Sequence, residues 1–166
     1  MKRHCLKSGF SLVEIITILF IISLGLVGIM SLIIQNIQSQ SYNKSNLIAY
    51  QLAQEGVELI RKVRDSNWRE GVAYDDKLSP GAYLMDYEDT APQLYISVDP
   101  EELILRQSAG NMYIHDTAIA TRTPFSRLIT LQAIDDHSFR VDSKISWVEH
   151  ERNYVYDLEA ILYDWR

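Results

Sequence analysis

The chain has 166 residues, carries a formal net charge of −6 and contains a single cysteine, Cys5. This length leaves room for one soluble domain of about a hundred residues beside an N-terminal third of different character. The acidic balance argues against nucleic-acid binding, since domains that bind nucleic acid usually carry a basic patch. A chain with one cysteine forms no disulfide within itself, which excludes a disulfide-stapled fold.

An apolar run dominates the N-terminal third. From Ile15 to Ile34 there are twenty residues without a charge, mostly Ile, Leu, Val, Phe and Met. A helix needs about this length to cross a hydrocarbon core of roughly 30 Å. The residues before the run include Lys2, Arg3 and Lys7 but no acid, so the positive-inside rule keeps them in the cytoplasm and exports the C-terminal part. The sequence therefore predicts a single-pass protein of the cytoplasmic (inner) membrane.

The residues at the start of the run distinguish it from an ordinary secretory signal. A secretory signal is cleaved at small residues after its apolar stretch, where this chain reads QNIQSQS. The small pair Ser8-Gly9 instead precedes the run, and one acid, Glu14, lies just inside it. The chain thus has a basic leader, then GFSLVEI with Gly9, Phe10 and Glu14, and then an unbroken apolar helix. This order of features resembles the prepilin signal of type IV pilins and type II secretion pseudopilins.

The resemblance implies a route of processing and assembly. A dedicated prepilin peptidase would cleave after Gly9, Phe10 would become an N-methylated terminus, and the helix would be kept as the core of a filament at the cell surface or in the periplasm. The implied partners are other pilin subunits through the N-terminal helix, the peptidase, the inner-membrane assembly machinery and membrane lipid. Cleavage would remove Lys2, Arg3 and Lys7 and no acid, so the formal charge of −6 would fall by three to −9.

Glu14 is the one charged residue that the start of the apolar helix has to accommodate. A charge within a membrane span costs roughly 2.5 to 3.5 kcal/mol at the centre and usually has a partner, yet no cation occurs between Ile15 and Ile34. Cleavage after Gly9 would create an α-amine, which is largely protonated at neutral pH because its reference pKa is about 8. We expect Glu14 to pair with that Phe10 amine and to act in assembly. In the alternative, a signal-anchored single-span protein with an extracytoplasmic binding domain, the positive end of the helix dipole merely favours an early acid.

The helix is expected to continue beyond the membrane, to residue 66. No proline occurs before Pro80, so nothing forces a break. Apolar residues recur at steps of three and four after residue 45, as a helix packed on a sheet requires; this face comprises Ala49, Leu52, Ala53, Gly56, Ile60 and Val63. Asp65-Ser66-Asn67 reads as the stop. We therefore divide the chain into a leader (1–9), a long helix (10–66, of which 10–34 span the membrane) and an exported domain (67–166). Gly25 and Gly28 either weaken the helix, by about 1 kcal/mol each relative to Ala, or allow close helix packing.

The sequence pattern of the expected exported domain predicts a β-rich fold. After a polar connection from Trp68 to Pro80, short alternating runs separated by turn residues indicate strands; they lie at 81–87, 94–98, 103–106, 112–115, 127–133, 139–148 and 154–163. The last three should run antiparallel, with EHERN closing the final hairpin. Side-chain alternation places Trp147 inward on the second of these strands and Tyr154 to Leu162 inward, at every second residue, on the third. The predicted fold class is α+β, a long N-terminal helix packed on a C-terminal antiparallel sheet.

A narrower resemblance comes from three further segments. The helical stretch LAQEGVELIRKVRDSNW, the segment TPFSR at 123–127 and the terminal DWR are together similar to minor pilins of the pilus accessory type. The resemblance implies a structural subunit of a type IV pilus or a related secretion filament.

Residue types that perform catalysis or bind metals lack the spacing that such sites need. His115, His137 and His150 fall in unrelated turns or strand ends, without the paired spacing of zinc ligands, and no GxSxG, HExxH or phosphate-binding glycine loop occurs. Calcium takes carboxylate ligands, but acids in turns of an exported domain are more often solvated; they cluster here at Asp86, Glu88 and Asp89, at Asp99, Glu101 and Glu102, and at Asp135 and Asp136. We expect no enzyme activity, no cofactor and no metal.

Overall fold

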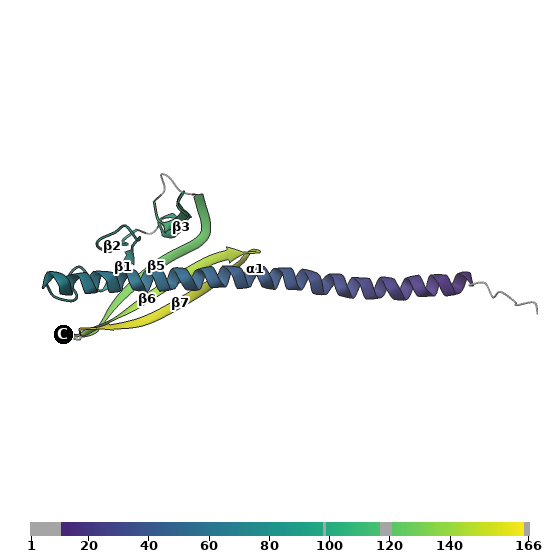
Figure 1. Ribbon diagram of the computed structural model, residues 1–166, viewed down its shortest axis with the longest axis horizontal. Helices are drawn as coiled ribbons and strands as arrows, with labels where there is room; N and C mark the ends of the chain where they lie inside the picture. The colour runs from purple at the N-terminus through teal and green to yellow at the C-terminus, as the bar shows by residue number, and fades with distance from the viewer. Residues whose placement is uncertain (1–10, 98, 117–120, 165–166) are drawn as a thin grey trace, which may run out of the picture. The chain divides into compact units, whose positions relative to one another are not determined.

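The computed structural model describes residues 11–97, 99–116 and 121–164, and within these ranges the chain forms one long α-helix, seven strands and one short 3-10 helix (Figure 1). The elements are α1 (Leu12–Glu70), β1 (Gly81–Leu84), β2 (Gln93–Leu94), η1 (Pro100–Leu103), β3 (Ile104–Gln107), β4 (Tyr113–Ile114), β5 (Thr121–Asp135), β6 (Ser138–Glu149) and β7 (Arg152–Tyr163). The chain divides into two compact units, residues 1–43 and residues 44–166. The predicted leader (1–9), Phe10 and the last two residues of the terminal DWR lie outside the described residues.

Helix α1 ends at Glu70, four residues beyond the end predicted from Asp65-Ser66-Asn67. Gly71 has a left-handed φ of 76°, and its amide donates to the Trp68 carbonyl while the Val72 amide donates to the Asn67 carbonyl. This is a Schellman cap, which satisfies the last carbonyls of a helix and favours glycine at the left-handed position. Asn67 stays inside the helix because its buried side-chain amide bonds two carbonyls of the following connection, those of Tyr74 (3.0 Å) and Asp76 (2.7 Å).

The predicted polar connection, residues 68–80, begins within the last turn of α1 and is less polar than its sequence indicates. Trp68, Tyr74 and Leu78 are all buried, at 5 to 8% exposure. The Tyr74 ring stacks on the ring of Phe139 at a centroid distance of 5.9 Å. The expected polar loop therefore closes one end of the core, and its aspartates face solvent.

Three long antiparallel strands form the centre of the sheet, as the sequence predicts. β6 pairs with β7 over twelve consecutive residue pairs, from Ser138 and Tyr163 to Glu149 and Arg152, and β5 pairs along the other edge of β6. The free edge of β5 is shared: β1 pairs with residues 129–131, and β3 pairs with residues 121–126. β2 and β4 extend the sheet beyond β1 and β3. The three short strands predicted in the middle region are therefore present, with bounds shifted by one to four residues. Of these, β3 pairs directly with β5, whereas β2 and β4 join the sheet through β1 and β3.

β5 begins six residues earlier than predicted. The added residues include Pro124, and proline is disfavoured within a strand because it gives no ladder hydrogen bond. The structure accommodates Pro124 because the pairing of β3 with β5 shifts register between Ile104 and Arg106, and the pairing with β6 begins only at Phe125.

The β6–β7 hairpin is tighter than the predicted five-residue connection. Glu149 pairs with Arg152, which leaves His150 and Glu151 as a two-residue loop. Both have left-handed φ values, 50° and 63°, as a type I′ turn requires. That turn normally contains asparagine and glycine, so the sequence EHERN gave no signal for it.

The core lies between the second half of α1 and the inner face of the sheet, where Figure 1 shows β5, β6 and β7 side by side along the helix. The six residues of the predicted helix face are all buried. Opposite them lie the inward residues of β5 and β6: Phe125, Ile129, Leu131, Phe139, Val141, Ile145 and Trp147. On β7 the predicted inward row is half-buried, and only Leu162 is fully covered, because β7 is the outermost of the three strands. The predicted α+β fold is therefore confirmed.

Candidate functional site

The first half of α1 is an exposed apolar surface. Every large apolar side chain from Leu12 to Ile34 is 44 to 72% exposed, and among the described residues the most apolar stretch of the helix contains no buried position. Exposed apolar surfaces of this size mark interaction with other proteins or with a membrane. By its length and composition, this segment could cross a membrane.

Glu14 lies in the first turn of α1 and is exposed. Ser11 precedes the first helical residue, and the Ile15 amide donates to the Ser11 carbonyl, which places Ser11 at the N-cap and Glu14 three residues on. A serine at the N-cap with a glutamate at this position is the sequence of a capping box, and a carboxylate there also interacts favourably with the helix dipole. Helix initiation therefore accounts for an acid here without any partner. Gly9 and Phe10, the other predicted site residues, lie outside the described residues.

A second group of charged residues lies inside the compact unit of residues 44–166, around Arg127. Its side chain is fully buried on the inner face of β5. Nη2 donates to the Met85 carbonyl at 2.7 Å and lies 3.4 Å from Oδ1 of Asp86, just after β1. On the other side, Nη1 lies 3.2 Å from Oε1 of Glu55 on α1, as an ion pair without the alignment of a hydrogen bond. We call Glu55, Asp86, Arg127 and His115 the buried charge cluster.

His115 completes the cluster from the end of β4. Its ring Nδ1 lies 2.6 Å from Oδ1 of Asp86, and its backbone amide donates to Oδ2 at 2.8 Å. Burial alone would raise the pKa of Asp86, but the hydrogen bonds from the His115 ring and amide, with the charges of His115 and Arg127, outweigh burial and lower this pKa. The expectation that Asp86 and His115 are solvated in unrelated turns is therefore wrong: their side chains are 17% and 10% exposed.

The other predicted acid clusters have local structural roles. Asp99 accepts a hydrogen bond from the Glu101 amide and so caps η1. Asp135 accepts one from the His137 amide at 2.9 Å, which with a hydrogen bond from Ser138 lowers the pKa of Asp135. Among the residues that the structure describes, no three His, Cys, Asp or Glu side chains are grouped so that they could hold a metal ion.

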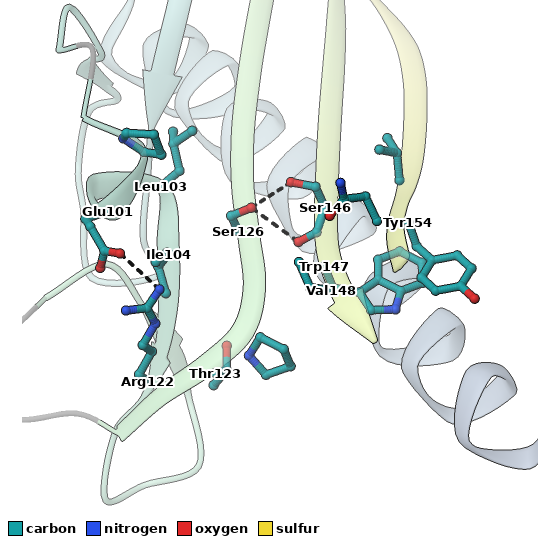
Figure 2. Close-up of a pocket in the computed structure, with 14 residues that line it drawn as sticks. Glu101, Leu103, Ile104, Arg122, Thr123, Ser126, Ser146, Trp147, Val148 and Tyr154 are labelled. Carbon is teal, nitrogen blue, oxygen red and sulfur yellow. Dashed lines mark hydrogen bonds and ion pairs between the residues drawn. The ribbon is translucent and has the colours of Figure 1, made fainter. Parts of the chain in front are cut away.

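A groove of about 480 Å³ lies between η1, β3 and the end of the β6–β7 hairpin (Figure 2). Figure 2 shows Ser126 and Ser146 directed toward one another across β5 and β6, and their hydroxyl oxygens are 2.7 Å apart. Arg122 forms an exposed ion pair with Glu101 at the rim, at 3.0 Å. Apolar side chains form most of the rest of the wall: Pro100, Leu103, Ile104, Pro124, Val148 and Val155. Such a lining suits packing against another surface.

Comparison of the chain with models of known protein families, with characterised proteins and with solved structures found no match. The structure by itself defines an α+β protein with one apolar N-terminal helix that could span a membrane and an antiparallel sheet packed on the second half of that helix.

The buried charge cluster is the feature that sequence reasoning missed. A signal for Arg127 was present, because it occupies the same alternating positions as the inward residues Ile129 and Leu131. Glu55 likewise borders the apolar face of α1, next to Gly56. Asp86 and His115 gave no such signal, since only the pairing of β1 and β3 with neighbouring parts of β5 brings these distant segments together.

Proposed function

We propose that the chain is a structural subunit, a minor pilin or pseudopilin, that a prepilin peptidase processes and that assembles through its N-terminal helix into a type IV pilus or related secretion filament. The observation that carries the proposal is the order of features along α1. The GF pair precedes the helix, Glu14 lies in its first turn, an exposed uncharged segment follows, and the same helix then packs on an antiparallel sheet.

In this proposal the charge of Glu14 acts in assembly, a role that a plain membrane anchor would not need. At the cytoplasmic edge of a bilayer the carboxylate can stay hydrated, so it costs little there. In the dry core of a helix bundle an unpaired carboxylate is costly unless a cation comes within reach. The α-amine of a processed Phe10, on this or an adjoining subunit, would supply that cation. Such a pair would also set the axial position of one helix against the next.

The exported domain is, in this proposal, a binding or packing module without catalytic activity or cofactor. The charged side chains in its interior are used to join elements of the fold: Arg127 joins α1, β1 and β5, and His115 joins the end of β4 to Asp86. The proposed partners are other subunits, the peptidase, the inner-membrane assembly machinery and lipid. The subunit would first lie in the inner membrane and then in a filament at the cell surface or in the periplasm.

The proposal is tested by the N-terminus of the protein from its own cells. Intact-mass analysis should show a chain that begins with methylated Phe10. Gly9→Val should accumulate the precursor, whereas Gly25→Ala, a matched change at a glycine within the helix, should be processed normally. A chain that still starts at Met1 in cells with an active prepilin peptidase would contradict processing and favour the signal-anchored alternative.

A further inference from the structure

Strand β7 forms a long edge of the sheet. Within the part of the chain that the structure describes, β7 pairs only with β6, along twelve consecutive residue pairs without a bulge. The strands at the other edges, β2 and β4, have two residues each. Natural sheets protect their edges with short strands, prolines, bulges or charges. β7 is long and has neither proline nor bulge, so of these devices it has only charged side chains.

Alternate residues of β7 direct their backbone groups away from β6. The Asp164 amide donates to the His137 carbonyl, and hydrogen-bonded pairs alternate along an antiparallel ladder. The even-numbered residues of β7 are therefore bonded to β6, whereas the amides and carbonyls of the odd-numbered residues point to the free edge. A further strand would find a regular row of donors and acceptors there. The odd-numbered residues are all exposed: Asn153, Val155, Asp157, Glu159, Ile161 and Tyr163.

The inner face of β7 is only half covered. Tyr156 and Leu158 are half-buried, although they belong to the same row as the fully covered Leu162. The Tyr156 ring meets the ring of Tyr50 on α1 edge-on, at a centroid distance of 5.8 Å, and Tyr50 is itself 38% exposed. A strand added beside β7, with apolar side chains on the face toward α1, would cover this row.

The outer face of β7 determines which charge such a strand should carry. Asp157 and Glu159 are successive residues on this face, and their cations lie one strand inward: Arg140 pairs with Glu159 at 3.0 Å, and Lys144 lies opposite Asp157. Burial, with the charges of Glu159 and Asp157, raises the pKa of Asp142 on the same face. On the free side of β7, a cation directly opposite Asp157 or Glu159 would be favourable, whereas an acid would be repelled.

The same acids argue against a second copy of this chain as the partner. If β7 paired antiparallel with β7 of another copy about its middle, an acid of one strand would lie opposite an acid of the other, which is destabilising. The other edges of the sheet offer a second copy only the short strands β2 and β4.

We propose that the free edge of β7 binds an extended segment of another protein as an additional antiparallel strand. In that segment, apolar residues facing α1 alternate with basic residues facing Asp157 and Glu159. Backbone hydrogen bonds would supply affinity, and the two acids would select the partner. The inference rests on the sheet and the second half of α1 and does not depend on the proposed filament function.

The test uses the full chain in non-ionic detergent micelles and short fluorescent peptides, with empty micelles as the blank. One peptide alternates valine with lysine, and a second alternates valine with glutamate. A third is the lysine peptide methylated at its lysine amides, which would face β7 in an antiparallel pair. Fluorescence anisotropy should show that the glutamate peptide binds about tenfold more weakly than the lysine peptide, because opposite-charge pairs become like-charge pairs. The methylated peptide should not bind, because it has lost its donors.

Hydrogen exchange followed by NMR locates the bound peptide. The amides of Val155, Asp157 and Ile161 should exchange rapidly in the free protein and slowly with the lysine peptide, whereas the even-numbered amides between them should be slow in both. Slow exchange of the odd-numbered amides without any peptide would overturn the proposal, because β7 would then already be paired with a second copy.

Charge reversal separates the edge from a general attraction of cations to an acidic protein. Asp157→Lys with Glu159→Lys should make the glutamate peptide the tighter ligand. The control, Glu88→Lys with Glu102→Lys, changes the net charge equally at exposed acids outside β7 and should keep the preference for lysine. The proposal is overturned if the lysine peptide does not bind, if its methylated form binds equally well, or if both double variants keep the same preference.

Discussion

Gly56 and Ser143 give a direct measure of how closely α1 approaches the sheet. Gly56 is buried in the middle of the helix, where glycine is usually unfavourable by about 1 kcal/mol relative to alanine. Gly56→Ala should nevertheless destabilise the protein, because the added Cβ would lie 2.4 Å from Oγ and 3.2 Å from Cβ of Ser143. Ser143 has no exposed surface, so its hydroxyl cannot turn away without displacing packed neighbours.

The magnitude follows from two opposing effects. Overpacking a core costs about 1 to 3 kcal/mol, and the gain in helix propensity offsets about 1 kcal/mol of that, which leaves a net loss of about 1 kcal/mol. Ser143→Ala removes the closest contact. It should cost little by itself, because Oγ of Ser143 has no hydrogen-bond partner in the described part of the chain. In that background Gly56→Ala should be neutral or stabilising.

The assay is a double-mutant cycle on residues 44–166, followed by thermal unfolding. We expect a coupling of about 1 to 2 kcal/mol between the two sites, in the range that residues in contact show. At about 4 °C per kcal/mol for a domain of this size, Gly56→Ala should lower Tm in the wild-type background and leave it unchanged or higher in the Ser143→Ala background. Equal effects of Gly56→Ala in the two backgrounds would refute the close contact.

Three further predictions concern residues 44–166. The fragment from Lys44 onward should be soluble and monomeric, because it forms a compact unit and leaves out the exposed apolar segment; sedimentation analysis checks this, and its Tm should be the same in calcium and in a chelator. The lowered pKa of Asp86 means that its ionised form stabilises the fold above its unfolded pKa of about 3.9 and that this contribution is lost as pH falls through the folded value. Asp86→Asn should therefore lower Tm at pH 7 and flatten its decline below pH 4, and an unchanged slope would contradict the assignment. His150→Asn and Glu151→Gly should each raise the free energy of unfolding by about 1 kcal/mol. Both positions have a left-handed φ, a conformation that costs residues other than Asn and Gly about that much. A lower Tm of either variant would argue against the type I′ turn.

The sequence predicted the elements whose pattern is long and regular. The helix face from Ala49 to Val63 and the inward alternation of β6 depend only on local periodicity, and both were identified correctly. The end of α1 was misplaced because Asn67 bonds the chain that follows it, a contact made only after folding. The start of β5 was misplaced for a similar reason, since Pro124 is tolerated only because the neighbouring strand shifts register there.

The candidate sites divide in the same way. The apolar segment and the early acid Glu14 can be identified from the sequence because they belong to one continuous stretch of residues. The buried charge cluster combines side chains from α1, the end of β1, the end of β4 and β5, which are up to 72 residues apart in the sequence between Glu55 and Arg127. Local pattern marks Arg127 as inward and places Glu55 at the border of the apolar helix face, but it does not indicate the set, because Asp86 and His115 each resemble a solvated polar residue.

The central claim, that this chain enters filaments through its N-terminal helix, is tested most directly by the charge of Glu14. Glu14→Gln keeps the size of the side chain and removes the charge, and Glu14→Ala removes both. Leader, span and topology do not depend on that charge, so both variants should insert in the membrane and be cleaved after Gly9. The measurement is the ratio of filament-bound to membrane-bound subunit after shearing of the cells. We predict a ratio near zero for both variants, and entry into filaments at the wild-type ratio would contradict the account.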